Sequence, residues 1–353
     1  MGTPGLFGLE IVDTAPSSLI WSLANALTLS ADSTIDVTGP TNGAVTGLLT
    51  IGSNRLSVTG GGAGPNLPYS LALGGGGVLL TGNPTFDVAN NGSGTGTLVL
   101  GALSDGGVPR TITKTDLGAL TLSTSATSMN AGDTVIVSGG TLNSNNATAL
   151  GTLTTVNLAA GATLSLGASQ TVAALGDAGT VVLDGATVLL NGNALTIGSS
   201  NNLSSTFSGV IADGTGGPGS LIKTGSGSLV LAGSDTYSGG TTVAAGTLVI
   251  ADGAALENGT SLTVGAGGTF VFDPSAAAGP VVAASPAETP VSVPEPSACT
   301  LLAACAVALA VFAWRRKEHV ARLSDGKMVP TIEYGHRLAV AVGSRLNEAH
   351  RNP

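Results

Sequence analysis

The side chains that most often carry out catalysis or bind metals are confined to the last part of this 353-residue chain. The two cysteines, Cys299 and Cys305, and the three histidines, His319, His336 and His350, all follow residue 298. Residues 1–298 therefore cannot form a Ser-His-Asp or Cys-His catalytic group, and they lack the usual zinc ligands and any disulfide. The histidines are also too widely separated to indicate a metal site. We expect no catalytic residue, no metal site and no cofactor.

The charged side chains of residues 1–297 are the next candidates for chemistry. An enzyme that cleaves acidic polysaccharides usually needs a basic residue or a carboxylate cluster in a groove. The acidic residues instead occur singly, in the manner of turn-capping residues. Examples are Asp177, Asp184, Asp213, Asp235 and Asp252. The calcium-binding nonapeptide is also missing, because the glycine-rich residues 60–64 lack its aspartate.

Charge divides the chain into two parts. Residues 1–297 carry seventeen acidic groups but four basic ones, whereas residues 298–353 carry eight basic and four acidic groups. The four basic residues of the first part are Arg55, Arg110, Lys114 and Lys223. Nucleic-acid binding requires clustered lysine and arginine, so we exclude nucleic acid as a partner of the main body.

The elements that hold these residues are predicted to be short strands. The chain contains 54 glycines, with 9% charged and 3% aromatic residues, and is rich in Thr, Ser, Val and Leu. This composition favours strands joined by tight turns over helices. Disorder is the competing interpretation, but it requires low hydrophobicity, and 42% of this chain is hydrophobic.

Internal repeats support the β prediction. Residues 113–123 (TKTDLGALTLS) parallel residues 222–232 (IKTGSGSLVLA), which places Lys114 over Lys223. That equivalence indicates a structural role for both lysines. Residues 49–54 (LTIGSN) recur at 195–200 (LTIGSS). Within these copies, runs of four or five residues alternate small or polar with apolar side chains, as in strands with one buried face.

A single coil of such strands cannot bury its apolar face, but stacked coils form one continuous core. We therefore predict an all-β fold, a right-handed parallel β-helix (solenoid) over residues 30–273. A β-sandwich of Greek-key type stays open as the alternative, because strand spacing does not fix connectivity.

Residues 207–250 closely resemble the autotransporter-associated β-strand repeat of bacterial surface-protein passenger domains. The resemblance rests on F-S-G-x-I at 207–211, L-x-K-T-G-x-G-x-L-x-L at 221–231, T-Y-S-G-G-T-T at 236–242 and A-G-T-L at 245–248. It implies an exported β-helical protein. The repeat residues that we expect to be structural are Lys223, Gly225, Gly227, Leu229, Tyr237, Gly239, Gly240, Gly246 and Leu248.

Tyr237 has two interpretations. An exposed tyrosine in a groove would be a stacking platform for a sugar, whereas a repeat aromatic would pack against the next coil with its hydroxyl bonded. We predict the packed position.

A linker and an apolar helix are predicted after the repeats. Residues 274–293 are rich in proline and alanine, which favours an extended chain. Residues 298–314 are seventeen uncharged residues. As a helix they would span about 25 Å, the lower limit for a transmembrane segment. The basic residues Arg315, Arg316 and Lys317 follow, which places that end in the cytoplasm and the repeats outside.

Pro294, Glu295 and Pro296, followed by the apolar segment and the basic cluster, resemble the PEP-CTERM sorting signal. The resemblance covers residues 294–317. It implies export, recognition of the Pro-Glu-Pro element by an exosortase-type processing enzyme, and cleavage that leaves the repeats at the cell surface or in the extracellular matrix.

Two segments depart from that pattern. Residues 318–353 continue well beyond the basic cluster as a mixed-charge tail without an assigned role. Residues 1–29 lack the basic and apolar regions of a signal peptide, so we expect the natural start to lie upstream.

The sequence thus predicts a non-catalytic exported protein with a structural or adhesive role, the bacterial membrane and an exosortase as partners, and extracellular polysaccharide as a candidate ligand. Two alternatives stay open: an autotransporter-type passenger fragment and a polysaccharide-active β-helix enzyme. An autotransporter would need a C-terminal barrel of amphipathic strands, for which the sequence gives no sign.

Overall fold

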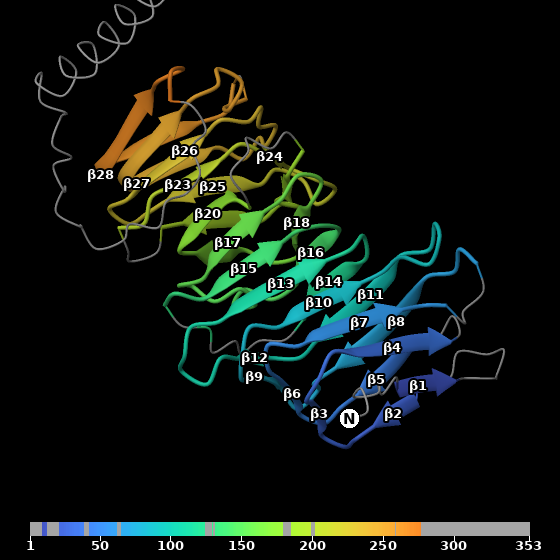
Figure 1. Cartoon of the computed structure of the whole chain (residues 1–353). Coiled ribbons are helices and arrows are strands. Elements are labelled where there is room, and N and C mark those ends of the chain that lie inside the picture. The colour runs from blue at the N-terminus through green and yellow to red at the C-terminus, as the bar shows by residue number, and fades with distance from the viewer. Residues whose placement is uncertain are drawn as a thin grey trace, which may run out of the picture. The chain divides into compact units, whose positions relative to one another are not determined.

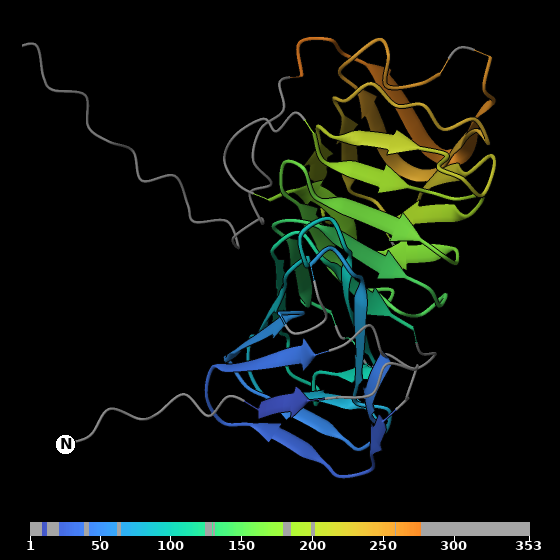
Figure 2. The same cartoon turned by 90° about the vertical axis from the view of Figure 1, so that its right-hand side faces the viewer.

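The computed structural model describes residues 9–12, 21–38, 42–61, 65–123, 129, 131–178, 185–198, 202–257 and 259–276. These residues lie within one compact unit, residues 1–285. They form strands and turns and contain no helix. The strands build a parallel β-solenoid of about ten turns, which confirms the predicted fold class. The turns stack in chain order from β1 to β28 (Figures 1 and 2).

Two long sheets form two faces of the solenoid. The first runs β1 (Leu9–Val12), β4 (Ser33–Thr38), β7 (Arg55–Thr59), β10 (Thr85–Val88), β13 (Thr111–Thr115), β15 (Thr134–Val137), β17 (Thr155–Leu158) and β20 (Ala174–Asp177). The second runs β2 (Trp21–Leu23), β5 (Asn42–Val45), β8 (Tyr69–Leu73), β11 (Gly96–Leu100), β14 (Ala119–Leu122), β16 (Thr141–Ser144), β18 (Thr163–Leu166), β21 (Thr187–Leu189) and β24 (Val210–Ala212).

Two shorter sheets complete the turns. One contains β12 (Leu103–Ser104), β9 (Val78–Leu80), β6 (Leu49–Ile51) and β3 (Leu27–Leu29). The other contains β19 (Gln170–Val172), β22 (Ala194–Ile197), β25 (Ser220–Lys223), β27 (Thr241–Ile250), β26 (Ser228–Leu231) and β23 (Ser205–Phe207), with β28 (Leu262–Phe272) on the far side of β27.

The register excludes the Greek-key alternative, because the described strand pairs are parallel and join successive turns. Thr111 pairs with Thr134, which pairs in turn with Thr155. These paired residues are 23 and 21 positions apart, and paired residues elsewhere in the stack are 19 to 30 positions apart. Turns of this length, each containing two or three short strands, are typical of solenoid repeats.

Alternating side chains build the core. Inward positions form apolar columns along the stack, and outward positions carry mainly Thr, Ser and Asn. One column of the second sheet consists of Leu71, Leu98, Leu120, Leu142, Leu164, Val188 and Ile211. Every member is buried. Such columns explain how a chain with so few aromatic residues can form a core.

The expected strand lengths were wrong at the C-terminal end of the solenoid. The sequence pattern predicts strands of four or five residues, but β27 has ten residues and β28 has eleven. β27 pairs with β25 through Thr241 and with β26 through Leu248, so it passes round a corner without a break. The sheets also include β1, β2 and β3, which precede the predicted boundary at residue 30.

Candidate functional site

Two buried lysines occupy the same position in two copies of the repeat. Lys114 lies near the end of β13, and Lys223 ends β25. Their exposed fractions are 0% and 1%, although lysine is almost never fully buried without partners. Each pairs with apolar residues of the turns before and after it, so its aliphatic chain takes a core position. This burial makes the two lysines the first candidates for a special role.

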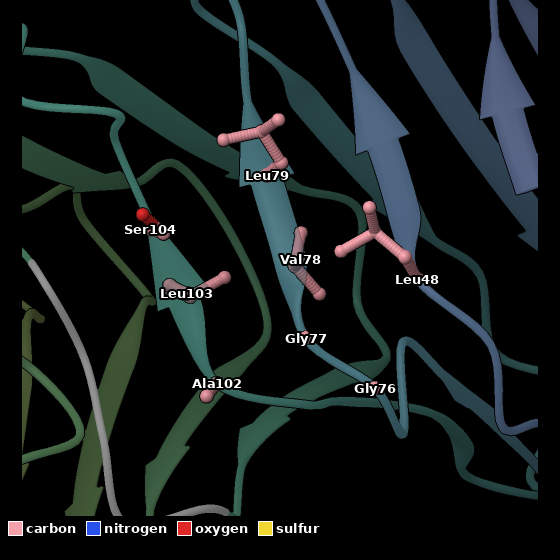
Figure 3. Close-up of a pocket in the computed structure, with 8 residues that line it drawn as sticks. All are labelled: Leu48, Gly76, Gly77, Val78, Leu79, Ala102, Leu103 and Ser104. Carbon is pink, nitrogen blue, oxygen red and sulfur yellow. The ribbon is translucent and has the colours of Figure 1, made fainter. Parts of the chain in front are cut away.

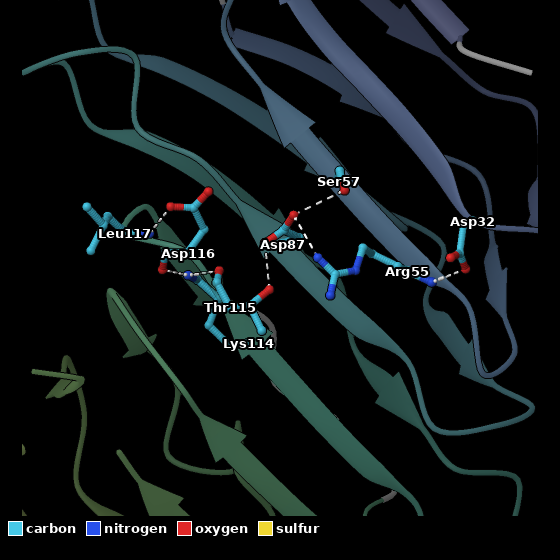
Figure 4. A network of polar contacts seen from close by, with 8 residues as sticks. All are labelled: Asp32, Arg55, Ser57, Asp87, Lys114, Thr115, Asp116 and Leu117. Atoms are coloured by element: carbon cyan, nitrogen blue, oxygen red, sulfur yellow. Dashed lines mark hydrogen bonds and ion pairs between the residues drawn. The ribbon is translucent and has the colours of Figure 1, made fainter. Parts of the chain in front are cut away.

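The ammonium group of Lys114 binds three backbone carbonyl oxygens at a corner of the solenoid. Nζ donates to the oxygens of Thr115 at 2.6 Å, Asp116 at 2.7 Å and Gly139 at 3.3 Å. Figure 4 shows the contacts within the turn. Gly139 belongs to the following turn. An ammonium group has three donors, so Lys114 uses all of them and joins two adjacent turns.

Lys223 repeats this arrangement. Its Nζ donates to the carbonyl oxygens of Thr224, Gly225 and Ala245, and Ala245 again comes from the following turn. The residue two positions after each lysine has a similar positive φ, 63° at Asp116 and 65° at Gly225. The repeat unit therefore specifies a lysine-filled corner as well as a strand pattern.

Burial lowers the pKa of Lys114 to about 8, while Asp116 and Asp87 act in the opposite direction. Burial also lowers the pKa of Lys223. A pKa of about 8 leaves Lys114 mainly protonated at neutral pH. A catalytic lysine needs a free lone pair and access to substrate. The three carbonyl oxygens around Nζ occupy its donors and shield it from substrate, so the geometry fits a structural role.

A polar network around Asp87 crosses the outward face of three strands (Figure 4). Asp87 accepts hydrogen bonds from Thr115 Oγ1 at 2.6 Å and Ser57 Oγ at 3.2 Å. It also forms an ion pair of 3.3 Å with Arg55, whose side chain is 51% exposed. Exposed ion pairs contribute about 0–1 kcal/mol. The network ties neighbouring turns together and contains a single carboxylate at its centre, rather than the paired acid and base of a hydrolase.

Two of the predicted turn-capping aspartates bind a neighbouring turn, and Asp213 also accepts a hydrogen bond of 2.7 Å from the backbone nitrogen of Gly219. Asp213 accepts hydrogen bonds from the backbone nitrogen and the hydroxyl of Ser238, at 3.0 and 2.6 Å. Asp177 binds Ser208 in the same way, with 2.7 Å to its hydroxyl. Stacking brings these donors within reach although they lie 25 and 31 positions away in the sequence. Both aspartates are thus used as bridges between turns.

Asp252 does cap its own turn, because its carboxylate accepts a hydrogen bond of 2.9 Å from the backbone nitrogen of Ala254. Asp184, which was also predicted to cap a turn, lies outside the described residues.

Among the described members of this set, Asp235 is the buried carboxylate, with 4% exposure. Its Oδ1 accepts a hydrogen bond of 2.8 Å from the backbone nitrogen of Ile211. Its Oδ2 has no hydrogen-bond partner among the described residues. Burial raises the pKa of Asp235 well above its ordinary value; the Ile211 contact lowers it and nearby Asp252 raises it. The folded protein therefore favours the protonated form more strongly than the unfolded chain does.

We expect Asp235→Asn to stabilise the protein at pH 7. The unfolded carboxyl ionises near pH 4, whereas the folded one resists ionisation. The stability that this group contributes is therefore complete below about pH 4 and is lost as pH rises towards its folded pKa. Asparagine keeps the acceptor for Ile211 and cannot ionise. Thermal unfolding at pH 7 and pH 4 should show a higher Tm for Asp235→Asn at pH 7 and a smaller difference at pH 4.

Asp213→Asn is the matched control for this prediction. Burial raises the pKa of Asp213, but hydrogen bonds from Ser238 and Gly219 outweigh burial and lower it. We therefore expect the opposite sign, a lower Tm at pH 7. If the Tm of the two variants changes equally between pH 4 and pH 7, Asp235 is not the carboxyl whose ionisation destabilises the folded protein.

Tyr237 takes the packed position. Its side chain is 1% exposed, and its hydroxyl lies 2.6 Å from Thr241 Oγ1. It cannot serve as a stacking platform for a sugar in this structure. Tyr69, which the sequence reading missed, is buried in the same manner, with its hydroxyl within hydrogen-bond distance of the carbonyl oxygens of Val58 (2.8 Å) and Ala89 (2.5 Å). The alternating pattern of β8 was the signal that could have located Tyr69.

The other predicted repeat residues are packing positions. Leu229 and Leu248 are both fully buried. Gly246 has φ 72°, a region that favours glycine. Gly227 is required for a different reason, since a Cβ there would lie 1.9 Å from the carbonyl oxygen of Leu203.

A groove of about 340 Å³ lies beside β9 and β12. It is lined by Leu48, Gly76, Gly77, Val78, Leu79, Ala102, Leu103 and Ser104 (Figure 3). Its one polar side chain is Ser104, and no titratable or aromatic side chain lines it. Catalytic and sugar-binding pockets need several converging polar groups. This groove offers none of the chemistry expected for polysaccharide cleavage.

The predicted sorting residues Pro294, Glu295 and Pro296, the basic cluster at 315–317, the apolar segment 298–314 and the tail 318–353 lie outside the described residues. Among the described residues, no helix is long and apolar enough to cross a membrane. The same residues contain no group of three or more His, Cys, Asp or Glu side chains placed to hold a metal ion.

Comparison with known families identifies the two sequence patterns. Residues 112–143 and 221–250 match the passenger-associated-transport-repeat family, and each match contains one lysine-filled corner. Residues 292–317 match the PEP-CTERM protein-sorting motif. No curated protein and no solved structure matches the chain. Both resemblances drawn from the residues are thereby confirmed.

The sorting motif implies an exported protein that is anchored in the membrane before processing, and an exosortase as its processing enzyme. Together with the repeat fold it indicates an exported surface protein.

Proposed function

We propose that this protein is a non-catalytic structural or adhesive component of the bacterial surface or extracellular matrix. The solenoid is its working part, and residues 294–317 form a temporary membrane anchor that an exosortase removes. The observation that carries this proposal is the order of the matched segments, with a repeat solenoid followed by a sorting motif.

The polar groups of the solenoid support the non-catalytic role. The two buried lysines are enclosed by carbonyl oxygens, and Asp87, Asp177 and Asp213 bind groups of adjacent turns. These groups are used to hold turns together. Release of oligosaccharides from a panel of acidic and neutral polysaccharides by the purified protein would overturn this part of the proposal.

The repeats alone would also suit an autotransporter-type passenger. The sorting motif at 292–317 favours the exosortase route. The two routes differ in whether export depends on the Pro-Glu-Pro element, so one substitution separates them.

Replacing Glu295 by Ala should cause uncleaved precursor to accumulate in the inner membrane. The apolar segment is unchanged, so insertion should proceed while recognition by the processing enzyme fails. Immunoblots of membrane and surface fractions would measure the ratio of precursor to mature protein. Glu288→Ala is the matched control, because it removes a glutamate from the same Pro-rich linker outside the sorting motif. Normal processing of Glu295→Ala would contradict the proposal.

Replacing both Leu301 and Leu302 by Asp should have a different effect. A charge costs about 3 kcal/mol near the centre of a transmembrane helix and somewhat less toward its end, so two charges at these positions should prevent membrane retention altogether. Loss of retention without precursor accumulation would distinguish the anchoring function of the apolar segment from the recognition function of Glu295.

A further inference from the structure

β28 is the last strand that the structure describes, and side chains on its inward side are exposed. β28 pairs with β27, and no described strand pairs with its other edge. Figures 1 and 2 show it at the end of the stack, in orange. Its inward positions continue the core columns of β27, because Val243 pairs with Val264 and Ile250 pairs with Phe272. Val243 and Ile250 are 0% and 2% exposed, whereas Val264 and Phe272 are 46% and 59% exposed.

The Pro-rich linker that follows β28 is poorly suited to cover this edge. Prolines occur at positions 274, 280, 286, 290, 294 and 296, and the longest run between them is five residues. Proline lacks the N–H that a sheet requires, so this linker cannot supply a partner as long as the eleven residues of β28. Exposed edges are normally protected by charged side chains or proline, and residues 262–272 contain neither.

The sequence of β28 is complementary to itself. If two copies run antiparallel with Gly267 opposite Gly267, Leu262 lies opposite Phe272 and Val264 lies opposite Phe270. These four positions share the inward side, because each pairs with a buried residue of β27. No charged residue faces another charged residue in this register: Asp273 would lie opposite Ser261. The apolar cores of the two solenoids would thus form one continuous core.

We propose that β28 is a dimerisation edge, which pairs antiparallel with β28 of a second copy and joins two solenoids end to end about a two-fold axis at Gly267. β28 follows β27 round a corner, and the axis exchanges its two arms, residues 262–264 and 269–272. An isologous contact of this kind closes on itself and yields a dimer rather than a fibre. This inference does not depend on the proposed function or on cleavage of the anchor.

Disulfide cross-linking tests the pairing register. In the full chain with Cys299 and Cys305 replaced by Ser, Gly267→Cys places two thiols directly opposite each other. Opposed residues of an antiparallel pair have Cα atoms about 4.5–5.5 Å apart, within the range of a disulfide. A Cβ at position 267 would lie 3.3 Å from the nearest heavy atom, the oxygen of Ala244, so a small shift accommodates it.

Thr269→Cys in the same background is the matched control, since its two copies would lie about 13 Å apart, four residues along the pair. We expect a covalent dimer from Gly267→Cys after mild oxidation in detergent solution, and at least ten-fold less from Thr269→Cys. Absence of the Gly267→Cys dimer, or equal cross-linking of both variants, would overturn the proposal. Equal cross-linking would indicate association through another segment, such as residues 298–314.

A charge exchange tests the side-chain pairing independently of the cysteines. Leu262→Lys with Phe272→Lys puts two lysines opposite each other, and sedimentation should show at least ten-fold weaker dimerisation. Leu262→Glu with Phe272→Lys makes the opposed pairs complementary and should restore the dimer. Both positions are exposed, at 41% and 59%, and circular dichroism should show that the fold is retained. If the two double variants dimerise as strongly as each other, the proposal is also refuted.

Discussion

Replacing Lys114 by methionine should lower the free energy of unfolding by about 3–5 kcal/mol at pH 7. Methionine fills a similar volume, but it leaves the carbonyl oxygens of Thr115, Asp116 and Gly139 without their donor at a partly buried corner. Removing one partner from a buried polar group costs far more than removing both. Lys223→Met should have a similar effect, because Nζ of Lys223 also donates to three carbonyl oxygens.

Arg55→Met is the control for these variants. It also removes a cation from the solenoid, but Arg55 is half exposed and its ion pair with Asp87 contributes little. Urea unfolding followed by circular dichroism measures the three variants, and hydrogen exchange shows which turns open. A loss below about 1 kcal/mol for both lysine variants would contradict the view that the lysines hold the corners together.

Leu229→Ala and Leu248→Ala should each cost about 2–5 kcal/mol, as expected for deletion of a buried leucine side chain. The two leucines pair directly across β26 and β27 and are fully buried. In a solenoid each turn contacts mainly its neighbours, so the loss should be concentrated near these strands. Denaturant midpoints give the magnitude, and hydrogen-exchange protection along the stack gives the location.

Val230→Ala provides the comparison on the same strand. Val230 points to the outer side of β26 and is partly exposed, so its truncation should cost under about 1 kcal/mol. If Leu229→Ala and Val230→Ala destabilise the protein equally, the assignment of inner and outer faces is wrong. Because Leu229 and Leu248 touch, their double variant should also deviate from additivity.

The sequence was sufficient to predict the architecture because the repeat signals are local. Alternation within β26 and the equivalence of Lys114 and Lys223 required no knowledge of the neighbouring turns. The sequence also predicted the packed position of Tyr237, since a repeat that stacks on itself leaves its aromatic residue inside.

What the sequence did not predict depends on how one turn lies upon the next. Short strands were expected, yet β27 continues through Gly246, because two strands of the preceding turn pair with the chain on both sides of the corner. The partners of Asp177 and Asp213 come from adjacent turns, and their identity depends on turn length. The burial of Asp235 likewise depends on its packing beneath another turn.

The central claim is that the exported protein loses its C-terminal anchor and leaves the solenoid as the mature product. Mass spectrometry of the protein isolated from its native cell envelope tests this most directly, because it reads the mature C-terminus. We predict that the mature chain retains the repeats through β28 and ends near Pro294, Glu295 and Pro296, without residues 298–353. A mature surface protein that still contains the apolar segment 298–314 and the tail would contradict this account and identify a permanently anchored protein instead.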